Sequence, residues 1–571
     1  MHRRWFLQKT NPEFVKYLSK TFCLSPLLAR ILINRGIKTA DAVKSFLDPG
    51  ISTLSAPYEL PDMKAAVERI KAALAGNERV LVHGDYDTDG LTATAIMVAG
   101  LKAAGVDVHY LIPHRMIHGY GFNPVAVETA KKLGARLIIT VDCGIVSFEA
   151  AAYAKREGID VIITDHHEPR KKPDTPDSFL LPEAVAVINP KLMGRDTKLL
   201  HLSGAGIAFK VAQALAMQDD LPFSDDDALS LIDLAAIGTL ADVVPLTGEN
   251  RVIAREGMKH IRNGERPGIR ALKEVSGLSG KDMRAGLLSF TMVPRINAAG
   301  RLGDSRDVVR LLLSEMDEEA LELSIWLDRL NTERQKIEEE VYQNALAALG
   351  PSPADPVIVL AGEGWHQGVV GVVASKIAEK FYRPAVILSL ENGLARGSAR
   401  SIPSFDICGA FSESSDLLLA FGGHTQAAGV KLESAKLEDF RERLCLIFNS
   451  SRDREVSPEI RIDADVRLSE ITFDLMRELS MLEPVGYGNP DPLLGARMLP
   501  VKSPRVVGNN HLKMKLGHES CSMDAIGFDM AGLFEKLGSP AALDVVFTPA
   551  INEWKGGRYL QMVLKAFRPG S

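Results

Sequence analysis

The sequence has few cysteines, and they are scattered along the chain. None of the five is spaced from another as metal-binding cysteines are, and an odd number does not suit a disulfide framework. The pattern argues against a disulfide-stapled secreted scaffold and predicts reduced thiols in a cytoplasmic protein. The cysteines are Cys23, Cys143, Cys408, Cys445 and Cys521.

The sequence also lacks an excess of basic charge and any long apolar run. Its formal net charge is -6, so contact with a nucleic acid would need a local basic patch. No stretch of about 18 apolar residues is present, which predicts no membrane partner. The N-terminal residues contain no apolar core of the kind that a secretory signal has.

What remains is the composition of an ordinary globular protein. The 571 residues are 46% hydrophobic and 25% charged, which supports well-packed cores and excludes extensive disorder. A chain of this length is expected to form about three or four domains.

The most informative stretch is Arg79–Ala95, where an apolar run ends in an acidic loop. Val80–Val82 are followed by His83, then by Asp85, Asp87 and Asp89, and a helix is predicted from Leu91. Carboxylates at alternate positions repel one another, and a divalent cation relieves that repulsion. For one such motif alone, a solvated acidic turn is the alternative. The imidazole of His83 beside the carboxylates favours a site for Mn2+.

Residues 65–245 alternate predicted strands and helices, which indicates a parallel sheet with right-handed crossovers. Ligands of such sheets gather at the carboxyl ends of the strands. Further acids and histidines stand at the ends of the following segments: Asp142, Asp165, His166, His167 and Asp242. One Asp of this kind is more often a helix cap, but four segments together predict a site for two cations.

These motifs, HGDYDTDG, VDCGI, TDHHEP and LADVVPL, resemble in order and context those of the DHH phosphoesterase superfamily. The triplet Asp165-His166-His167 is the signature of that superfamily. Motifs further along the chain extend the resemblance to the RecJ family of exonucleases, over about residues 50 to 571.

The resemblance implies two Mn2+ or Mg2+ ions per active site. It implies these ligands: Asp87, Asp89, Asp142, His166, Asp242 and His83. It gives catalytic roles to His167, which would face the scissile phosphate, and to Asp142, which could bridge the two ions. Asp85 would flank the site on the side of the phosphate.

Two motifs near the metal segments are predicted to bind phosphate. Arg115 lies in a loop with an aromatic neighbour, with a solvated loop as the alternative. The segment FTMVPRINAAGRLGDS presents Arg295, Asn297 and Arg301, which suit a phosphate backbone. Salt bridges between domains are the alternative there.

A polar helix over residues 315–348 is expected to connect to a second α/β unit. In that unit, ARGSAR offers Arg396, Ser398 and Arg400, and GGHTQAAG offers Gly422, Gly423 and His424. These match the substrate-binding domain associated with DHH domains. By resemblance, Ser398 and Arg400 would hold a 5′-terminal phosphate.

The last 116 or so residues are rich in predicted strands with Gly and Asn turns, which suggests an OB-like β-barrel that binds single strands. The predicted fold is therefore α/β and multidomain. Its parts are an N-terminal helical segment (1–50), a DHH catalytic domain with a parallel sheet (51–314), a connecting helix (315–350), a DHH-associated domain (351–455) and an OB-fold domain (456–571).

The predicted function is metal-dependent 5′→3′ hydrolysis of single-stranded DNA to 5′-mononucleotides, in DNA recombination and repair. Single-stranded DNA is the expected partner, and the resemblance adds single-strand-binding protein and a helicase as candidates. A DHH phosphodiesterase of short oligonucleotides or cyclic dinucleotides is the alternative. A non-enzymatic scaffold is disfavoured because every expected acid is present.

Overall fold

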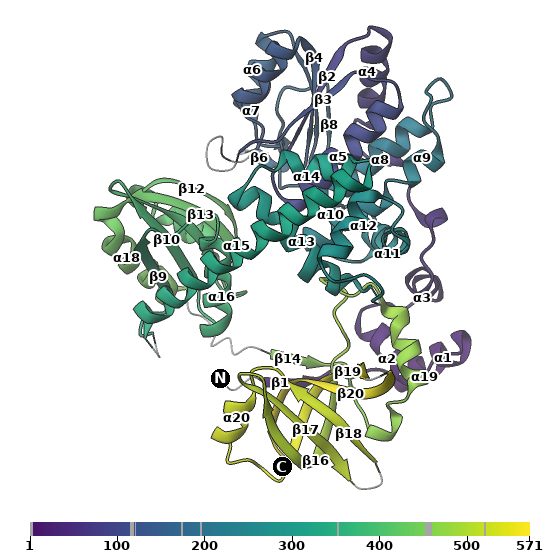
Figure 1. The fold of residues 1–571 in the computed structure, drawn as a ribbon, viewed down its shortest axis with the longest axis vertical. Helices are drawn as coiled ribbons and strands as arrows, with labels where there is room; N and C mark the ends of the chain where they lie inside the picture. Colours follow the sequence, from purple (N-terminus) through teal and green to yellow (C-terminus); the bar gives the residue numbers. More distant parts are fainter. Residues whose placement is uncertain are drawn as a thin grey trace.

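The computed structural model describes residues 4–114, 119, 121–172, 175–194, 197–281, 283–350, 353–451, 459–518, 521–554 and 556–570. Figure 1 shows a parallel α/β sheet at the top, a layer of helices beneath it, a second α/β unit to the left and a β-barrel at the bottom. Among the described residues, no helix is both long enough and apolar enough to span a bilayer.

The first sheet is parallel and has the order β3-β2-β4-β5-β8. Its strands are β2 (Arg79–Gly84), β3 (Val108–Leu111), β4 (Ala135–Val141), β5 (Asp160–Thr164) and β8 (Ala186–Ile188). The strand order reverses at β2, so the carboxyl ends of β2 and β4 border the crevice in which open α/β sheets bind ligands.

Helices cover both faces of this sheet, as the apolar strand sequences require. Alternate residues face opposite cores: Leu81 and Ile138 pack with α6 (Pro124–Leu133) and α7 (Phe148–Arg156). Val82 and Ile139 pack with α4 (Met63–Ala75), α5 (Thr88–Ala103) and α8 (Gly204–Ala216). A small hairpin of β6 (Arg170–Lys172) and β7 (Thr175–Leu180) lies beside the sheet.

A helical layer follows and carries the chain to the second unit. It contains α9 (Asp225–Leu229), α10 (Ile232–Ala241), α11 (Gly248–Asn263), α12 (Pro267–Val275), α13 (Ala285–Leu302) and α14 (Arg306–Leu313). The predicted connecting helix is α15 (Asp317–Leu349), which runs from this layer to the second unit in Figure 1.

The second unit is a mixed sheet of order β12-β13-β11-β10-β9, in which β9 and β10 are parallel and the other pairs antiparallel. Its strands are β9 (Ile358–Glu363), β10 (Ala385–Glu391), β11 (Leu394–Arg400), β12 (Leu418–His424) and β13 (Ala427–Glu433). The helices of the unit are α16 (Val370–Phe381), α17 (Ile407–Glu413) and α18 (Leu437–Ser450).

The C-terminal strands close into a barrel in the order β16-β17-β18-β20-β19, because β19 also pairs with β16. They are β16 (Leu494–Val507), β17 (His511–His518), β18 (Cys521–Gly527), β19 (Ala542–Trp554) and β20 (Gly557–Pro569). Short β15 (Ala464–Asp465) extends the sheet, and α19 (Phe473–Leu479) and α20 (Ala531–Lys536) lie beside it. The predicted OB-like barrel is confirmed.

The N-terminal segment is helical as predicted, with α1 (Pro12–Phe22), α2 (Pro26–Asn34) and α3 (Ala40–Leu47). It also has a strand that the sequence did not reveal: β1 (Arg4–Leu7) pairs in parallel with β14 (Glu459–Ile462). Arg4 pairs with Glu459, which lies 455 positions further along the chain, and a pairing between such distant segments leaves no signal in the local sequence.

Candidate metal centre

The predicted ligands converge where β2, β4 and β5 end. Asp85, Asp87 and Asp89 follow β2, Asp142 follows β4, and the Asp165–His167 triplet follows β5. Asp242 comes from outside the sheet, at the C-terminal end of α10. Asp142 and the residue after Asp242, Val243, both have a positive φ, near 60°. Strained backbone of this kind is typical of functional sites, where the surrounding structure holds it in place.

Three groups of side chains could each hold a cation. Within each group the donor atoms lie within 4.8 Å of one another; the groups are Asp85/Asp87/Asp142, Asp89/His166/Asp242 and Asp142/His166/His167. Asp142 and His166 each belong to two of the groups, so the three groups share donors and lie next to one another.

His166 is at the centre of the second group. Its Nε2 lies 3.1 Å from Asp142 Oδ1, 3.6 Å from Asp242 Oδ2 and 4.0 Å from Asp89 Oδ2. His166 Nε2 and Asp142 Oδ1 are both buried, and neither makes a hydrogen bond within the described part of the chain. Buried polar atoms that face one another without hydrogen bonds indicate that a further group binds between them.

The electrostatics of the site also favour cations. Burial, and then the charge of Asp87, raises the pKa of Asp89 to about 7. Burial, and then the charges of Asp89 and Asp87, raises the pKa of Asp242 to about 8, and the pKa of Asp142 is likewise raised well above its usual value. Burial and the charge of His167 lower the pKa of His166 to about 3, which keeps its imidazole neutral, as metal ligation requires. The donor set of carboxylates with one neutral imidazole fits Mn2+ or Mg2+.

Asp165 does not join any of these groups; it holds His167. Asp165 Oδ1 accepts hydrogen bonds from the backbone N–H groups of His166 and His167 at 2.7 and 3.0 Å, and lies 2.7 Å from His167 Nδ1. Burial alone would lower the pKa of His167, but the charge of Asp165 outweighs burial and raises it to about 9. The carboxylate therefore fixes the His167 ring at the edge of the site and favours its cationic form, and a cationic His167 leaves the other two groups as the cation sites.

Glycines let the helices approach the carboxylates closely, and these contacts were not predicted from the sequence. The N–H groups of Gly204 and Ala205, at the start of α8, donate to Asp89 at 2.6 and 2.9 Å. A Cβ on Gly204 would lie 2.5 Å from the Cβ of Asp142, and one on Gly238 would lie 2.5 Å from Asp89 Oδ1. These glycines thus let the start of α8 and the helix α10 pack directly against the ligands.

His83 is placed differently from the other predicted ligands. It is buried at the end of β2, with its Nε2 3.3 Å from the carbonyl oxygen of Gly121 and its ring against Phe122. None of the three groups found among the described residues includes it. Its role as a ligand stays a prediction.

The second unit meets the metal centre through β12. The rings of His167 and His424 are stacked, with centroids 6.5 Å apart and an angle of 12° between planes. His424 follows Gly422 and Gly423 at the exposed end of β12. The motif GGH therefore borders the site, although no anion contact tests its predicted role.

Ser398 and Arg400 come together on β11 beside the start of α16. The Arg400 guanidinium donates to Ser398 Oγ at 3.1 Å, and a Cβ on Gly371 would lie 3.2 Å from the same oxygen. An arginine and a hydroxyl at a helix N-terminus form a site suited to phosphate. Arg396 lies on the same strand, two residues before Ser398.

The motif on α13 makes structural contacts. Arg295 pairs with Asp328 of α15 at 2.8 Å, and Asn297 Oδ1 accepts from the N–H and hydroxyl of Thr88 at the start of α5, at 3.0 and 2.9 Å. Arg301 donates to the carbonyl of Gly368 in the second unit at 2.7 Å. Only the contact of Arg295 with Asp328 is a salt bridge, and none of the three contacts tests the predicted binding of phosphate. Together they hold the acidic loop and both units in place. Arg115 lies outside the described residues.

Comparison with known proteins agrees with this geometry. Residues 79–239 match the DHH family N-terminal domain, residues 354–450 the DHHA1 domain, and residues 462–566 the RecJ OB domain. The chain is 38% identical over 568 residues to the single-stranded-DNA-specific exonuclease RecJ of Bacillus subtilis, covering 98% of this chain and 70% of that protein. The chain belongs to the RecJ family.

Other members of the RecJ family match over a similar extent. The single-stranded-DNA-specific exonuclease RecJ of Salmonella typhimurium is 35% identical, over 96% of both chains. The crystal structure of RecJ from Thermus thermophilus in complex with Mn2+ superposes with a TM-score of 0.85 at 32% identity, covering 100% of this chain and 80% of that one.

Proposed function

We propose that this protein is a metal-dependent exonuclease that hydrolyses single-stranded DNA from its 5′ end and releases 5′-mononucleotides. The observation that carries the proposal is the set of carboxylates and His166 arranged around the shared Asp142, in a member of the RecJ family. Support for the choice of substrate comes from the second unit and the barrel.

Asp85, Asp87 and Asp142 would hold one ion, and Asp89, His166 and Asp242 the other, with Asp142 between them. Asp85 was expected to lie near phosphate, but only 3% of it is exposed and it sits among carboxylates, so a role as ligand explains its place better. When bound, the two cations would supply Lewis acidity for the attacking water and the leaving oxygen. Asn297 and Asp165 orient the residues of the site through the contacts described above.

His167 is the group of this chain that would touch the scissile phosphate. Its cationic ring, fixed by Asp165, can donate from Nε2 to a phosphate oxygen and stabilise the charge that develops there. His424 stacks on this ring from the second unit and limits where the ring can move.

Ser398 and Arg400, at the N-terminus of α16, would bind the terminal 5′-phosphate. A guanidinium gives paired hydrogen bonds to a phosphate, and the N–H groups of the first helical turn add to them. A pocket for a terminal group, facing the metal centre from the second unit, would set the polarity of degradation. The roles of Arg396, Gly422, Gly423, His424, Arg295, Asn297, Arg301 and Arg115 in binding phosphate stay predictions.

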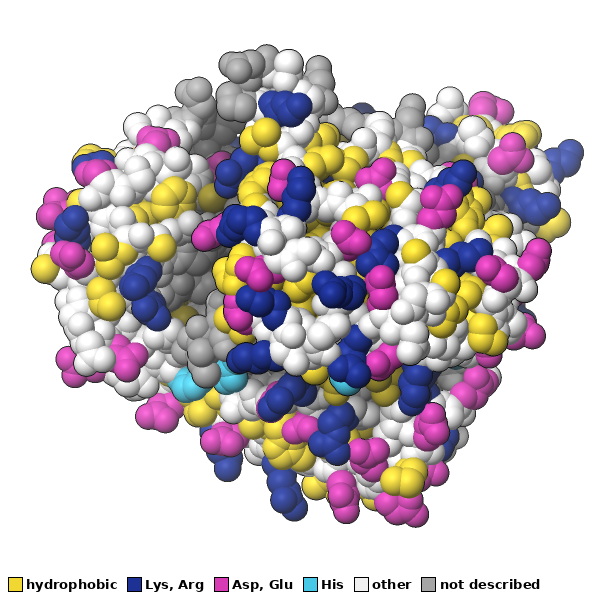
Figure 2. All heavy atoms as spheres, turned by 90° about the horizontal axis from the view of Figure 1, so that it is seen from above, with side chains coloured by type: hydrophobic (Ala, Val, Ile, Leu, Met, Phe, Trp, Pro, Cys, Tyr) yellow, Lys and Arg dark blue, Asp and Glu magenta, His cyan; other side chains and the backbone are white. Residues whose placement is uncertain are grey.

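The barrel carries an unusual arrangement of charge. On the neighbouring strands β16 and β17, Lys502 stands opposite Lys515 and Arg505 opposite Lys513. Like charges opposite one another destabilise a sheet by themselves. Lys515 also has Asp524 of β18 opposite it, whereas Lys513 has Ile526, so the pair of Arg505 and Lys513 in particular favours an anionic ligand at this surface. A single strand of DNA supplies such charge along its backbone. On the face drawn in Figure 2, by contrast, basic and acidic side chains are interspersed.

The remaining expectations are carried as proposals. We propose the domain division given by the sequence, residues 51–314 for catalysis, 351–455 for the 5′ end and 456–571 for the strand. A cytoplasmic location, and recruitment by single-strand-binding protein and a helicase, are proposed on the family resemblance.

A substrate panel tests the proposal on the whole protein. With Mn2+, a long single strand with a 5′-phosphate is expected to be degraded to mononucleotides, and a blunt duplex is expected to resist. Rapid cleavage of dinucleotides or cyclic dinucleotides, with a long strand left intact, would instead identify a phosphodiesterase of short substrates.

A further inference from the structure

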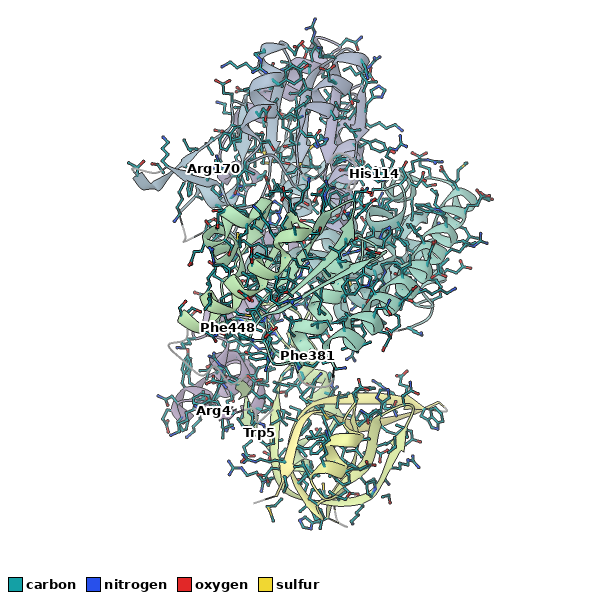
Figure 3. All side chains as sticks on the ribbon, turned by 90° about the vertical axis from the view of Figure 1, so that its left-hand side faces the viewer. Arg4, Trp5, His114, Arg170, Phe381 and Phe448 are labelled. Carbon is teal, nitrogen blue, oxygen red and sulfur yellow. The ribbon has the colours of Figure 1, made fainter. Side chains whose placement is uncertain are left out.

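The N-terminal segment joins the barrel to the helices below the metal centre. Strand β1 pairs with β14, and the N–H of Gln8 donates to the carbonyl of Ile462 at 3.0 Å. The ring of Trp5 lies 4.5 Å from the guanidinium carbon of Arg568 in the barrel. Figure 3 shows Arg4 and Trp5 at the junction between the N-terminal helices and the barrel.

The helices of this segment share one core with the chain that enters the barrel. Leu28, Ile31 and Leu32 pack in a cluster with Leu475 and Leu482, and residues of β19 and β20 lie against the same cluster. The N-terminal segment is therefore part of the support of the barrel. The sequence predicted only a helical segment here and gave no sign of this supporting role.

One arginine of α11 fastens this support to the helices below the metal centre. Arg251 is 2% exposed, and its guanidinium lies 3.8 Å from the centre of the Phe46 ring on α3. Its Nε donates to the carbonyl of Phe46 at 2.8 Å. Its other donors reach four consecutive carbonyls of the segment before the barrel, those of Met481, Leu482, Glu483 and Pro484, at 3.0, 3.0, 3.0 and 3.4 Å.

Three further side chains extend the same network. Asn489 is fully buried and donates to the carbonyls of Leu482 and Pro484, both at 2.8 Å. Arg35, at the end of α2, donates to Asn489 Oδ1 and to the carbonyl of Pro490. Arg255, one turn after Arg251 on α11, donates to the carbonyl of Leu47 at 2.5 Å.

The contacts of Arg251 link segments that belong to different domains. Its cation is buried, and within the described residues it forms no ion pair with a carboxylate. Burial accordingly lowers the pKa of Arg251 to about 9. A buried charge that is balanced by backbone carbonyls, the Phe46 ring and the charge of Glu483, without a direct ion pair, is a costly way to fill a core. What the guanidinium provides is a rigid, planar set of donors that joins α3, α11 and residues 481–484 in one geometry.

We propose that Arg251 is a positioning residue for the exonuclease. It holds the barrel in a fixed place relative to the metal centre, so that a strand bound on the barrel is directed toward the metal site. The proposal rests on the proposed function. It implies that Arg251 affects the processivity of the enzyme on a long strand. It also implies that Arg251 has little effect on the hydrolysis of a substrate too short to reach the barrel.

The test compares Arg251→Met with Arg266→Met. Arg266 pairs with the buried Asp233 at 3.0 Å within the helical layer and contacts neither the N-terminal segment nor residues 481–490 among its described hydrogen bonds. Both substitutions remove a cation and keep the size of the side chain, so Arg266→Met controls for general destabilisation. Two quantities are measured for both variants. One is the amide hydrogen exchange of residues 459–493, and the other is the run length, the number of nucleotides removed from a long strand per binding event in the presence of excess unlabelled competitor DNA.

Arg251→Met is expected to increase exchange in residues 459–493 at least tenfold and to shorten the run length at least threefold. Its rate on a trinucleotide is expected to stay within twofold of the rate of Arg266→Met. Equal exchange in the two variants, or equal losses on long and short substrates, would overturn the proposal. Arg35→Gln, at the edge of the network, replaces Arg251→Met if that variant does not fold, and the same two outcomes decide.

The exchange measurement needs no activity. If the wild type degraded no long strand, the proposed function would fail, while the exchange comparison would still decide whether Arg251 fixes the barrel.

Discussion

Gly204→Ala tests how tightly the fold encloses the metal ligands. A Cβ at this position would lie 2.5 Å from Asp142 Cβ, 2.6 Å from its Oδ1 and 2.7 Å from its Cγ. Carbon atoms in contact are normally about 3.5–4.0 Å apart. Either Asp142 or the start of α8 must therefore move by roughly 1 Å, and the stem of Asp142 cannot give way as a flexible side-chain end could.

The expected losses of stability and of catalytic rate in Gly204→Ala follow from that displacement. Overpacking of a core typically lowers the free energy of unfolding by about 1–3 kcal/mol. A misplacement of about 1 Å in a catalytic group typically lowers the rate by about 100-fold. The shift of α8 would also weaken the two hydrogen bonds that Asp89 accepts from Gly204 and Ala205.

The assay is hydrolysis of single-stranded DNA at saturating Mn2+, together with unfolding in urea and calorimetric titration with Mn2+. Gly100→Ala is the matched control, because it lies inside α5 and its Cβ would meet its neighbours at an ordinary 3.7 Å. Activity of Gly204→Ala within threefold of the control, with unchanged Mn2+ affinity, would refute the close packing of α8 on Asp142.

Further substitutions test the other parts of the account. Asp165→Asn is expected to lower kcat at least tenfold with Mn2+ binding retained, because His167 loses the carboxylate that fixes its ring; loss of metal binding in calorimetry would contradict this. Arg400→Ala and Ser398→Ala are expected to reduce the preference for a 5′-phosphate over a 5′-hydroxyl end, measured as a ratio of rates; an unchanged ratio would place the phosphate elsewhere. The double variant Lys513→Glu, Lys515→Glu is expected to weaken binding of single-stranded DNA and to lower the slope of log affinity against log salt by about 0.7 for each phosphate that the barrel no longer neutralises. An unchanged slope in a filter-binding assay would indicate that the strand binds to another face of the barrel.

The metal centre was largely predictable because each of its residues carries a local signal. Each acid that follows β2, β4 or β5 stands at the end of an apolar run, and the rule that ligands bind at the carboxyl ends of parallel strands brings them together. Asp242 was recognisable by its motif, although it reaches the site from the end of a helix.

The contacts between distant segments could not be read from the sequence. Gly204 and Gly238 are small because they face Asp142 and Asp89, which are far away along the chain. Asn297 was predicted to bind phosphate, which stays a prediction, and the hydrogen bonds that its Oδ1 accepts from the distant Thr88 had no signal in the sequence. The pairing of β1 with β14 and the carbonyl contacts of Arg251 depend on how the domains meet, which no periodicity encodes.

The most direct test of the two-metal exonuclease uses a single-stranded oligonucleotide labelled at one end or the other. Wild type and Asp142→Ala are incubated with Mn2+, with Mg2+ or with a chelator. We expect the wild type to release the 5′ label early as a mononucleotide, and we expect no release with chelator or with Asp142→Ala. Early release of the 3′ label would contradict the polarity, and cleavage by Asp142→Ala at the wild-type rate would contradict the metal centre.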